Sequence, residues 1–521
     1  MERKFDPSKH STRLIALKLA YLGKYYNGFE YHANNPTPLP TVEEELWKAL
    51  SKSKLIMPSD TNPLLPGVVN WEGCEYSKCG RTDKGVSAFG QVIGIRVRSN
   101  RPLKNGEACN PLNINGTTVA VNRQGTHPFE NGLKDIGGKP DVLGMNDSGN
   151  EDTLSFDPVE DEIQYPMILN RLLPPDIRIL AWCPSPPSDF SARFSCKERQ
   201  YKYFFTQPAF LPIPQHLETK SNGATTKTTQ DGWLDIAAMQ EAAKSFIGLH
   251  DFRNFCKVDG SKQITNFERR IFHADIVEEN TTVGFVNGSS FLLESSQTTG
   301  VSSKSPRFPK VYSFTLHGSA FLWHQVRHMV AILFLVGQGL ESPAIVSQLL
   351  DVKKNPRRPI YEMATDIPLV LWDCIFPHED DMERKDALQW LYVGDELGKG
   401  DMKYGSQGLM EDVWKLWRER KVDEVLAGAL IDIISSQGKD AQSLTYTQKR
   451  GKKSQRVFDG GNAPKLQGTY LPVMKKPLLE STETINEKYA LRKGWESQED
   501  FKKQGLRGLE KPVSKEDDGK E

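Results

Sequence analysis

The sequence predicts an α/β (α+β) protein of two domains with long polar extensions. A chain of 521 residues exceeds what one hydrophobic core usually organises. Stretches of alternating apolar residues, typical of strands with one buried face, are interspersed with stretches in which apolar residues recur at helical spacing. The content of 38% hydrophobic and 26% charged residues suits packed cores joined to long polar segments. We therefore expect antiparallel-rich sheets flanked by helices, with a central cleft.

An N-terminal α/β domain is expected over residues 13–216, after a tail at 1–12. Its first strand is predicted by alternating apolar residues, Ile15, Leu17, Leu19 and Tyr21. Thr41 then begins a helix, with Glu44 three residues later completing a capping box. The apolar stripe of this helix is Val42, Leu46, Trp47 and Leu50. Further strands are expected near 93–97, 177–182 and 201–205.

A polar segment at 99–162 interrupts this domain. It is rich in Asn, Gly, Asp and Pro and has little periodicity, so we expect a disordered insertion whose deletion leaves catalysis intact. Residues 101–165 hold five Lys/Arg against eleven Asp/Glu, although the formal net charge of the chain is 0. The remainder is therefore basic by six, which is compatible with an RNA-facing surface.

A C-terminal α/β domain is expected over 217–380, opening with a Thr/Lys-rich linker at 217–231. The predicted elements are a helix from Asp235, strands at 270–277 and 309–316, a Ser-rich flexible loop at 298–308, a long helix from about Phe321, a helix begun by Ser342 and Pro343, and a strand over 368–375. The apolar stretch 320–340 contains His324, Arg327 and His328, whose charges would be costly in lipid. It is expected to be a buried helix of a soluble protein.

A charged C-terminal extension follows over 381–521, predicted to be helical and partly disordered. Four of its residues have helical spacing and could pack on the core: Leu409, Val413, Leu416 and Trp417. The basic run 449–453 fits a phosphate contact, a nuclear import signal or a solvated loop. Nucleus and cytoplasm both remain open as the compartment.

The seven cysteines are scattered, which fits a reducing compartment and makes disulfides unexpected. Cys74 and Cys79 lie five apart without a second pair, so the spacing disfavours structural zinc and predicts buried or neutral thiols. The first ten residues mix acidic and basic side chains and have no apolar core, so a secretory signal is not expected.

The four residues 82–85, Thr-Asp-Lys-Gly, would by themselves be an ordinary turn, because Asp and Gly are favoured in turns. The wider string 79–88, CGRTDKGVSA, resembles the signature of the TruA family of tRNA pseudouridine synthases, with Asp83 at the family's catalytic aspartate. The segments 189–193, 199–203 and 321–330 are similar to its later motifs, in family order. Lys84 and Ser87 replace the Ala and His usual in bacterial members, which puts a bacterial range of targets in doubt.

The resemblance implies an enzyme that isomerises uridine in tRNA with Asp83 as its catalytic carboxylate. It further implies that Tyr201 stacks on the flipped base, that Arg81 fills the gap in the stack, and that Arg327 pairs with the carboxylate. Such a pair could form two parallel hydrogen bonds. From the residues alone, Tyr201 could equally be a half-buried strand aromatic, and Arg327 a structural ion pair.

The segments 250–257 and 322–327 are most similar to the eukaryotic branch that modifies positions 38 and 39 of the anticodon arm. The expected partner is tRNA, held mainly by phosphate contacts. The candidates for these contacts, each of which could instead be a solvated charge, are Lys84, Arg193, Arg199 and Lys257. The resemblance implies no metal, no organic cofactor and no membrane, and suggests a homodimer.

Three alternatives remain open. One is the multi-site eukaryotic relative with the same chemistry. Another is a tRNA-binding or folding protein that keeps the scaffold without catalysis, which intact Asp83, Tyr201 and Arg327 argue against. The last is a metal-dependent RNA hydrolase, which would need clustered carboxylates that the sequence does not show.

Overall fold

The computed structural model describes most of the chain, including the four segments 79–88, 189–193, 199–203 and 321–330. The described residues are 5–32, 37–57, 68–103, 156–212, 231–279, 309–377, 387–395, 403–438 and 455–505. The linker at 217–230, the loop at 298–308, the basic run 449–453 and residues 104–155 of the insertion lie outside them. Within the described residues, no helix has the length and apolar character needed to cross a membrane.

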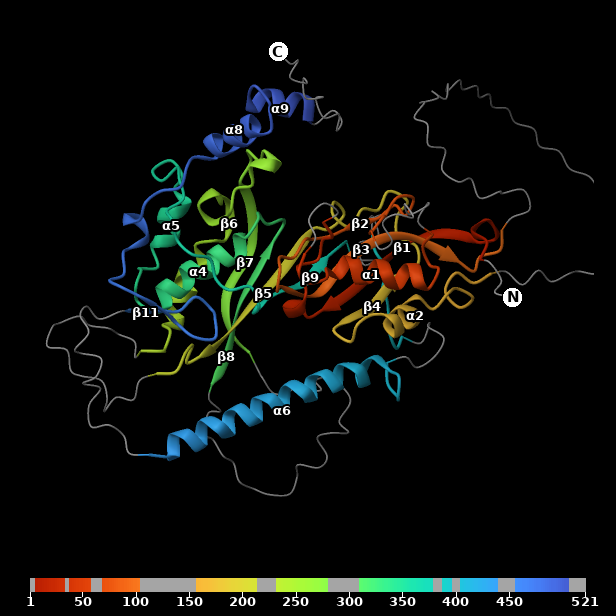
Figure 1. The fold of residues 1–521 in the computed structure, drawn as a ribbon, viewed down its shortest axis with the longest axis horizontal. Coiled ribbons are helices and arrows are strands. Elements are labelled where there is room, and N and C mark those ends of the chain that lie inside the picture. Colours follow the sequence, from red (N-terminus) through yellow and green to blue (C-terminus); the bar gives the residue numbers. More distant parts are fainter. Residues whose placement is uncertain are drawn as a thin grey trace, which may run out of the picture.

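A single mostly antiparallel sheet runs through both halves of the molecule (Figure 1). Its strands, in spatial order, are β10 (Leu391–Tyr392), β4 (Ile177–Cys183), β1 (Ser11–Tyr21), β3 (Ser87–Ser99), β9 (Leu369–Ile375), β5 (Glu198–Gln207), β8 (Lys310–Gly318), β7 (Glu268–Glu279) and β6 (Gly248–Asp251), and β2 (Ser77–Lys78) pairs with β3. The predicted fold class is confirmed, with the sheet continuous from one half to the other.

The N-terminal half of the sheet is covered by α1 (Val42–Lys52) and α2 (Tyr165–Leu172) (Figure 1). The alternating residues predicted for β1 are buried, and Ile15 pairs with Ile95 of β3. Thr41 caps α1 as predicted, its side chain accepting a hydrogen bond from Glu44 N at 3.2 Å. Burial of the apolar residues of β1, β3, β4 and α1 gives this half its own hydrophobic core.

The C-terminal half contains α3 (Ile236–Lys244), α4 (Gln325–Gly337) and α5 (Ile345–Leu350), which pack on β5, β7 and β8 around a second core. Asp235 caps α3 through a hydrogen bond from Ala238 N, as its position before the predicted helix implies. All thirteen residues of α4 are buried, which confirms the expected buried helix. It begins at Gln325 rather than near Phe321, and α5 begins at Ile345, two residues after Pro343.

Strand β9 joins the two halves. It runs parallel to the start of β3, where Ser87 faces Val370, and antiparallel to β5, where Tyr201 faces Leu371. A strand expected to close the C-terminal domain therefore lies in the middle of the sheet. The loop before β3, which contains Asp83, is consequently placed where the N-terminal and C-terminal halves meet.

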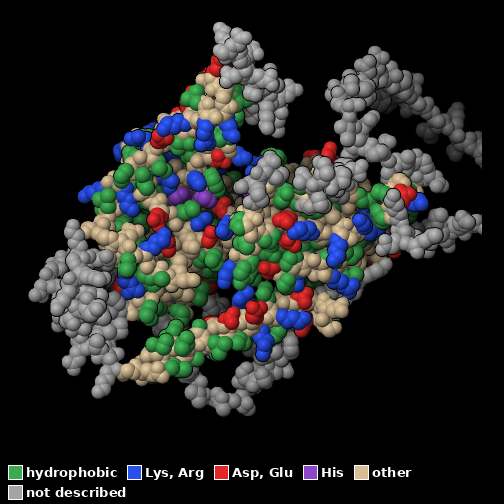
Figure 2. Space-filling view, viewed as in Figure 1, with side chains coloured by type: hydrophobic (Ala, Val, Ile, Leu, Met, Phe, Trp, Pro, Cys, Tyr) green, Lys and Arg blue, Asp and Glu red, His purple; other side chains and the backbone are tan. Residues whose placement is uncertain are grey.

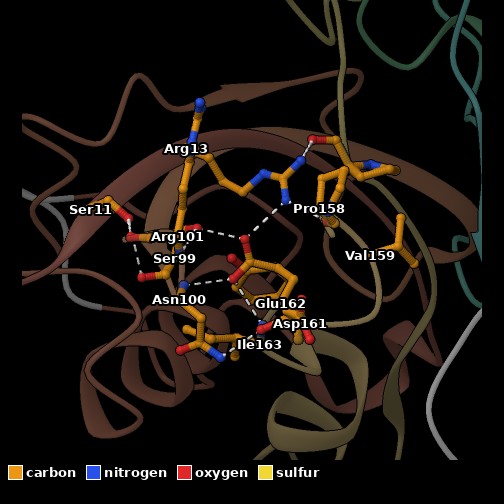
Figure 3. Close-up of polar contacts among 12 residues, drawn as sticks. Ser11, Arg13, Ser99, Asn100, Arg101, Pro158, Val159, Asp161, Glu162 and Ile163 are labelled. Atoms are coloured by element: carbon orange, nitrogen blue, oxygen red, sulfur yellow. Dashed lines mark hydrogen bonds and ion pairs between the residues drawn. The ribbon is translucent and has the colours of Figure 1, made fainter. Parts of the chain in front are cut away.

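The ends of the insertion are ordered, which corrects the prediction that all of 99–162 is disordered. Glu162 is buried, and its carboxylate accepts hydrogen bonds from Arg13 Nη1 at 2.9 Å, Ser99 Oγ at 2.6 Å and Asn100 N at 2.9 Å (Figure 3). Arg13 also donates to the Pro158 carbonyl. These contacts tie the residues on either side of 104–155 to strands β1 and β3.

Parts of the C-terminal extension pack on the C-terminal half. The hairpin of β11 (Gln455–Val457) and β12 (Lys465–Gln467) adds Val457 and Phe458 to the core, and α8 (Thr482–Arg492) and α9 (Gln498–Gly505) follow. The separate helix α6 (Leu409–Ser436) runs along the outside of the molecule (Figure 1). Of its predicted docking residues, Leu409, Leu416 and Trp417 are half-buried, whereas Val413 is exposed.

Candidate active site

The loop that carries Asp83 is fixed by backbone hydrogen bonds to the preceding loop of the N-terminal half. Thr82 O accepts from Phe29 N at 3.1 Å, and Gly85 N donates to Tyr26 O at 3.2 Å. The side chain of Thr82 is buried, so the loop is held from both sides. This fixing orients the carboxylate before substrate arrives, which is the arrangement a catalytic group requires.

The glycine at position 85 is required by the geometry of the turn. Its φ of +80° lies in the left-handed region, and a Cβ there would meet the carboxyl carbon of Asp366 at 3.0 Å. Val86 N donates to Asp83 O at 3.1 Å, which closes the turn. A second carboxylate is thereby packed directly beside the loop that bears Asp83.

The Asp83 carboxylate contacts two residues that immediately precede helix α4. Trp323 Nε1 donates a hydrogen bond to Asp83 Oδ1 at 3.3 Å, and His324 Nε2 lies 3.4 Å from Asp83 Oδ2. His324 has φ +60° and ψ +12°, a left-handed conformation that is costly for a residue with a side chain. This bend ends the preceding turn and directs both rings towards the carboxylate.

Burial raises the pKa of Asp83 above its ordinary value, and the neighbouring Asp366 adds to the increase. The positive charge of Arg327, the hydrogen bond from Trp323 and the charge of Lys257 act in the opposite direction. Arg327 is therefore the strongest of the groups that keep Asp83 ionised. The partly buried environment raises the pKa of Asp83, and the neighbouring cations Arg327 and Lys257 oppose this increase.

The expected two-bond pair between Arg327 and Asp83 is not present in the described part of the chain. Arg327 is 8% exposed, and its Nε donates to the Ala364 carbonyl at 2.8 Å. This bond anchors the guanidinium to the segment between α5 and β9. Arg327 acts on Asp83 through its charge, while the direct contacts come from Trp323 and His324.

The imidazole of His324 is neutral at pH 7. Burial, with the charges of Arg327, Lys257 and Arg358, lowers its pKa to about 4. The 3.4 Å approach of its Nε2 to Asp83 Oδ2 is therefore a contact of a neutral ring with the carboxylate rather than an ion pair at neutral pH. His324 Nδ1 is buried and has no hydrogen-bond partner among the described residues, so the proton is placed on Nε2, facing the carboxylate.

Tyr201 lies on β5 with its ring half-buried, packed edge-on against Phe321 with ring centroids 5.0 Å apart. Burial raises the pKa of its hydroxyl well above the ordinary value, and the charge of Asp83 contributes to this increase. The phenol is therefore protonated at neutral pH. Tyr201, Asp83 and Arg327 belong to one electrostatic neighbourhood.

The other residues predicted to contact tRNA differ in their exposure to solvent. Lys84 and Arg193 are exposed, and Arg81 is exposed with its Nε 3.0 Å from Glu30 Oε2. The Arg199 guanidinium is instead turned inward and donates to the carbonyls of Ser319, Cys79 and Arg193. These contacts give Arg199 a structural task, and its role in tRNA binding remains a prediction.

Sequence reasoning did not assign a role to three residues that the structure places at the carboxylate: Trp323, His324 and Asp366. The first two belong to the segment that resembles the family's third motif, so their adjacency to Arg327 was an available signal. Asp366 has no such signal, because the chain brings it to Gly85 only through the path between α5 and β9.

Lys257 links the Trp323 ring to the surface. Its Nζ lies 4.5 Å from the centroid of that ring, and its backbone N donates to the Trp323 carbonyl. Together with Arg327 it places positive charge next to Asp83, which suits an anionic substrate. On the face shown in Figure 2, Lys and Arg side chains are spread over both halves of the molecule among Asp and Glu side chains.

One group in the described residues could hold a metal ion. The sulfur atoms of Cys79, Cys196 and Cys374 all lie within 4.8 Å of one another, and all three residues are buried. The six described cysteines are free thiols. The spacing of Cys74 and Cys79 could not reveal this cluster, because its members come from three separate elements.

Comparison with known proteins agrees with the geometry. A sequence profile of the family described as tRNA pseudouridine synthase matches residues 242–377. The tRNA pseudouridine(38/39) synthase of Saccharomyces cerevisiae is 38% identical over 491 residues, which cover 94% of this chain and 80% of that protein. Its counterpart in Homo sapiens is 36% identical over 75% of this chain and 59% of the human protein.

More distant similarity extends to archaea, where tRNA pseudouridine synthase A of Methanothrix thermoacetophila is 26% identical over 65% of this chain. The aspartate-bearing loop, the fixed carboxylate and the extent of the match to the yeast protein lead to the same conclusion. The chain belongs to the tRNA pseudouridine synthase family.

Proposed function

We propose that this protein converts uridine to pseudouridine at positions 38 and 39 of the tRNA anticodon arm. The observation that carries the proposal is the fixed Asp83 carboxylate, half-buried within the electrostatic reach of Arg327 and contacted by Trp323 and His324. The relatives named tRNA pseudouridine(38/39) synthase, at 36–38% identity, support the two target positions. The reaction is an isomerisation, so it needs no redox partner.

The chemistry breaks the N1–C1′ bond, turns the uracil and joins C5 to C1′, after which the C5 proton leaves. Asp83 supplies a carboxylate that can act as nucleophile or take a sugar proton, dividing one hard step into easier ones. The hydrogen bond from Trp323 and the contact with His324 hold it in place. Arg327 supplies the positive charge that favours its ionised form.

Access to a stacked uridine requires base flipping. Tyr201 offers a protonated, half-buried aromatic face next to the carboxylate for the flipped base. Arg81 is exposed on the same loop as Asp83 and forms an ion pair with Glu30, so it can leave this partner to fill the vacated place. Surface ion pairs of this kind contribute little to stability.

The experiment is position-resolved pseudouridine mapping of tRNA incubated with the wild type or with Asp83→Ala or Asp83→Asn. Both variants should lose turnover while largely retaining tRNA binding and their circular dichroism spectra. Pseudouridine at 38 and 39 with the wild type alone is the expected result. Modification elsewhere would contradict the target positions, and tight binding without modification by any of the three proteins would favour a non-catalytic scaffold.

We also propose that the enzyme is a homodimer in which helix α6 pairs with α6 of a second copy. One face of the helix carries an apolar stripe whose residues are 42–64% exposed: Val422, Val425, Leu426, Leu430, Ile433 and Ile434. The helix has no buried residue. Exposed apolar surface of this extent is typical of an interaction site.

The charges at the start of the stripe are compensated within the helix, because Arg420 lies near Glu419 and Asp423, and Lys421 pairs with Glu424. The apolar stripe is therefore the feature that would carry the pairing, and Gly428 within it permits close approach. Light scattering should give a dimer mass for the wild type and a monomer mass for Leu426→Glu/Leu430→Glu, with Glu419→Gln as control. A monomeric wild type would refute the pairing.

We further propose that the enzyme acts in nucleus and cytoplasm without a membrane. The basic run 449–453 is the sequence feature that supports nuclear import. A fluorescent fusion should enter the nucleus, and replacement of the basic residues of this run by Ala should shift it to the cytoplasm. An unchanged distribution would contradict import through this run.

A further inference from the structure

Three cysteines from distant parts of the sequence converge beside the loop that carries Asp83. Cys79 follows β2, Cys196 precedes β5, and Cys374 lies near the end of β9. They are 4%, 7% and 4% exposed, and their sulfur atoms lie within 4.8 Å of one another. The reaction proposed above uses none of these groups.

We infer that Cys79, Cys196 and Cys374 bind one thiophilic metal ion, with Zn²⁺ as the best-suited candidate. Thiolates select zinc and other soft metals over magnesium or calcium. Thiolates bound tetrahedrally to zinc at about 2.3 Å lie roughly 3.8 Å from one another, so the observed cluster needs only small shifts to close on an ion. The fourth position of the tetrahedron is left for an oxygen ligand.

The charge around the cluster fits a metal–thiolate group. The Arg199 guanidinium donates to the carbonyls of Ser319, Cys79 and Arg193, and it makes no ion pair with a carboxylate in the described part of the chain. Three thiolates with one Zn²⁺ carry a net charge of −1, which this half-buried cation balances. A half-buried cation is more stable with an anionic group nearby than without one.

Such a site would have a mechanical consequence for the catalytic loop. The ion would join the segment after β2, the segment before β5 and strand β9, which come from both halves of the sheet. Asp83 lies four residues after Cys79 on the same loop. The metal would thus be structural, because it would fix the position of the loop that carries Asp83 relative to β5 and β9.

The test measures metal in the full-length protein, without tRNA, after expression in medium supplemented with zinc. Elemental analysis should find about one Zn²⁺ per chain in the wild type and in the controls Cys74→Ser and Cys256→Ser, whose thiols are buried elsewhere. Cys196→Ser and Cys374→Ser should lose most of it. Circular dichroism identifies any variant that fails to fold.

Cobalt provides a second readout that does not depend on a variant. Wild-type protein stripped of metal and refilled with Co²⁺ should show the intense near-ultraviolet absorption of thiolate-to-cobalt charge transfer, whereas Cys196→Ser should not. A wild type that carries no stoichiometric metal and binds Zn²⁺ no more tightly than Cys196→Ser would overturn the inference. A disulfide between any two of the three cysteines, found by peptide mapping under non-reducing conditions, would overturn it in favour of a redox pair.

Discussion

Trp323 Nε1 donates a hydrogen bond to Asp83 Oδ1 at 3.3 Å, although 240 residues separate the two in the chain. The indole is 41% exposed, and Lys257 covers its ring with Nζ 4.5 Å from the centroid. One side chain therefore contacts both the proposed catalytic carboxylate and a cation at the surface. Its position allows it to orient Asp83 and to meet the substrate.

Replacing Trp323 by Phe should lower kcat by about 10-fold or more, since hydrogen bonds to charged groups contribute about 1.5–3 kcal/mol. The apolar ring is kept, so folding and tRNA affinity should change little. Trp372→Phe is the matched control, because this half-exposed ring also lies under a lysine, with Lys202 Nζ 4.4 Å from its centroid. Single-turnover kinetics measures the effect, and equal losses in the two variants would contradict a specific role.

The pH profile of the reaction should respond to Arg327. Burial raises the pKa of Asp83 and Arg327 lowers it, so activity that needs the carboxylate should fall as the pH decreases through this raised pKa. Arg327→Gln removes the cation and should move the acid limb of kcat/KM to higher pH. Arg327→Lys keeps the charge and should leave the limb closer to that of the wild type. Identical acid limbs in wild type and Arg327→Gln would show that Arg327 does not act on Asp83.

The same raised pKa makes a prediction about stability. A carboxyl group whose pKa is higher in the folded than in the unfolded state destabilises the fold at every pH above the folded value, and this cost disappears below the unfolded value. Asp83→Asn should therefore unfold at a slightly higher temperature than the wild type at pH 7, while being inactive. The difference should shrink as the pH is lowered towards 4, which thermal unfolding in a series of buffers can follow. A lower Tm for Asp83→Asn than for the wild type at pH 7 would contradict the inference that the ionised Asp83 carboxylate destabilises the fold.

Motif and periodicity predicted the strand of Ile15, the cap at Thr41, the buried helix of Arg327 and the loop of Asp83, because each depends on neighbours in the sequence. They could not predict that Trp323 and His324 would reach the carboxylate, since this depends on the left-handed turn at His324 and on the placement of the start of α4 beside the loop that carries Asp83. The predicted direct pair between Arg327 and Asp83 is not formed for a similar reason, because the Arg327 guanidinium donates to the Ala364 carbonyl instead.

The other features that the sequence did not predict depend on contacts between residues far apart in the chain. Strand β9 is the last predicted strand of its half, yet it inserts between β3 and β5 and brings Cys374 to Cys79 and Cys196. Spacing along the chain carries no information on such a meeting. The ordered ends of the insertion were missed because Glu162 looks like a solvated acidic residue until its partners on β1 and β3 are known.

Glu162 should be required for stability, in contrast to the rest of the acidic insertion. Although burial opposes its charge, hydrogen bonds from Ser99, Asn100, Ile163 and Arg13 lower the pKa of Glu162 below its ordinary value. Glu162→Gln removes the charge that these donors face, and we expect a loss of about 3 kcal/mol in the free energy of unfolding, as for other buried ion pairs that lose one partner. Glu160→Gln, two residues away and exposed, is the matched control.

The pH dependence gives this prediction a sign. A carboxyl group with a lowered folded pKa stabilises the protein above its unfolded pKa, and the stabilisation is lost as the pH falls through the folded value. The difference in the free energy of unfolding between wild type and Glu162→Gln, measured with denaturant, should therefore be largest at pH 7. It should decrease as the pH falls below about 4.3.

Deletion of 104–155 with Glu162 retained should preserve both stability and pseudouridine formation, since the ends of the insertion stay anchored. If that deletion unfolded the protein, or if Glu162→Gln and Glu160→Gln were equally stable, the anchoring role of Glu162 would be refuted.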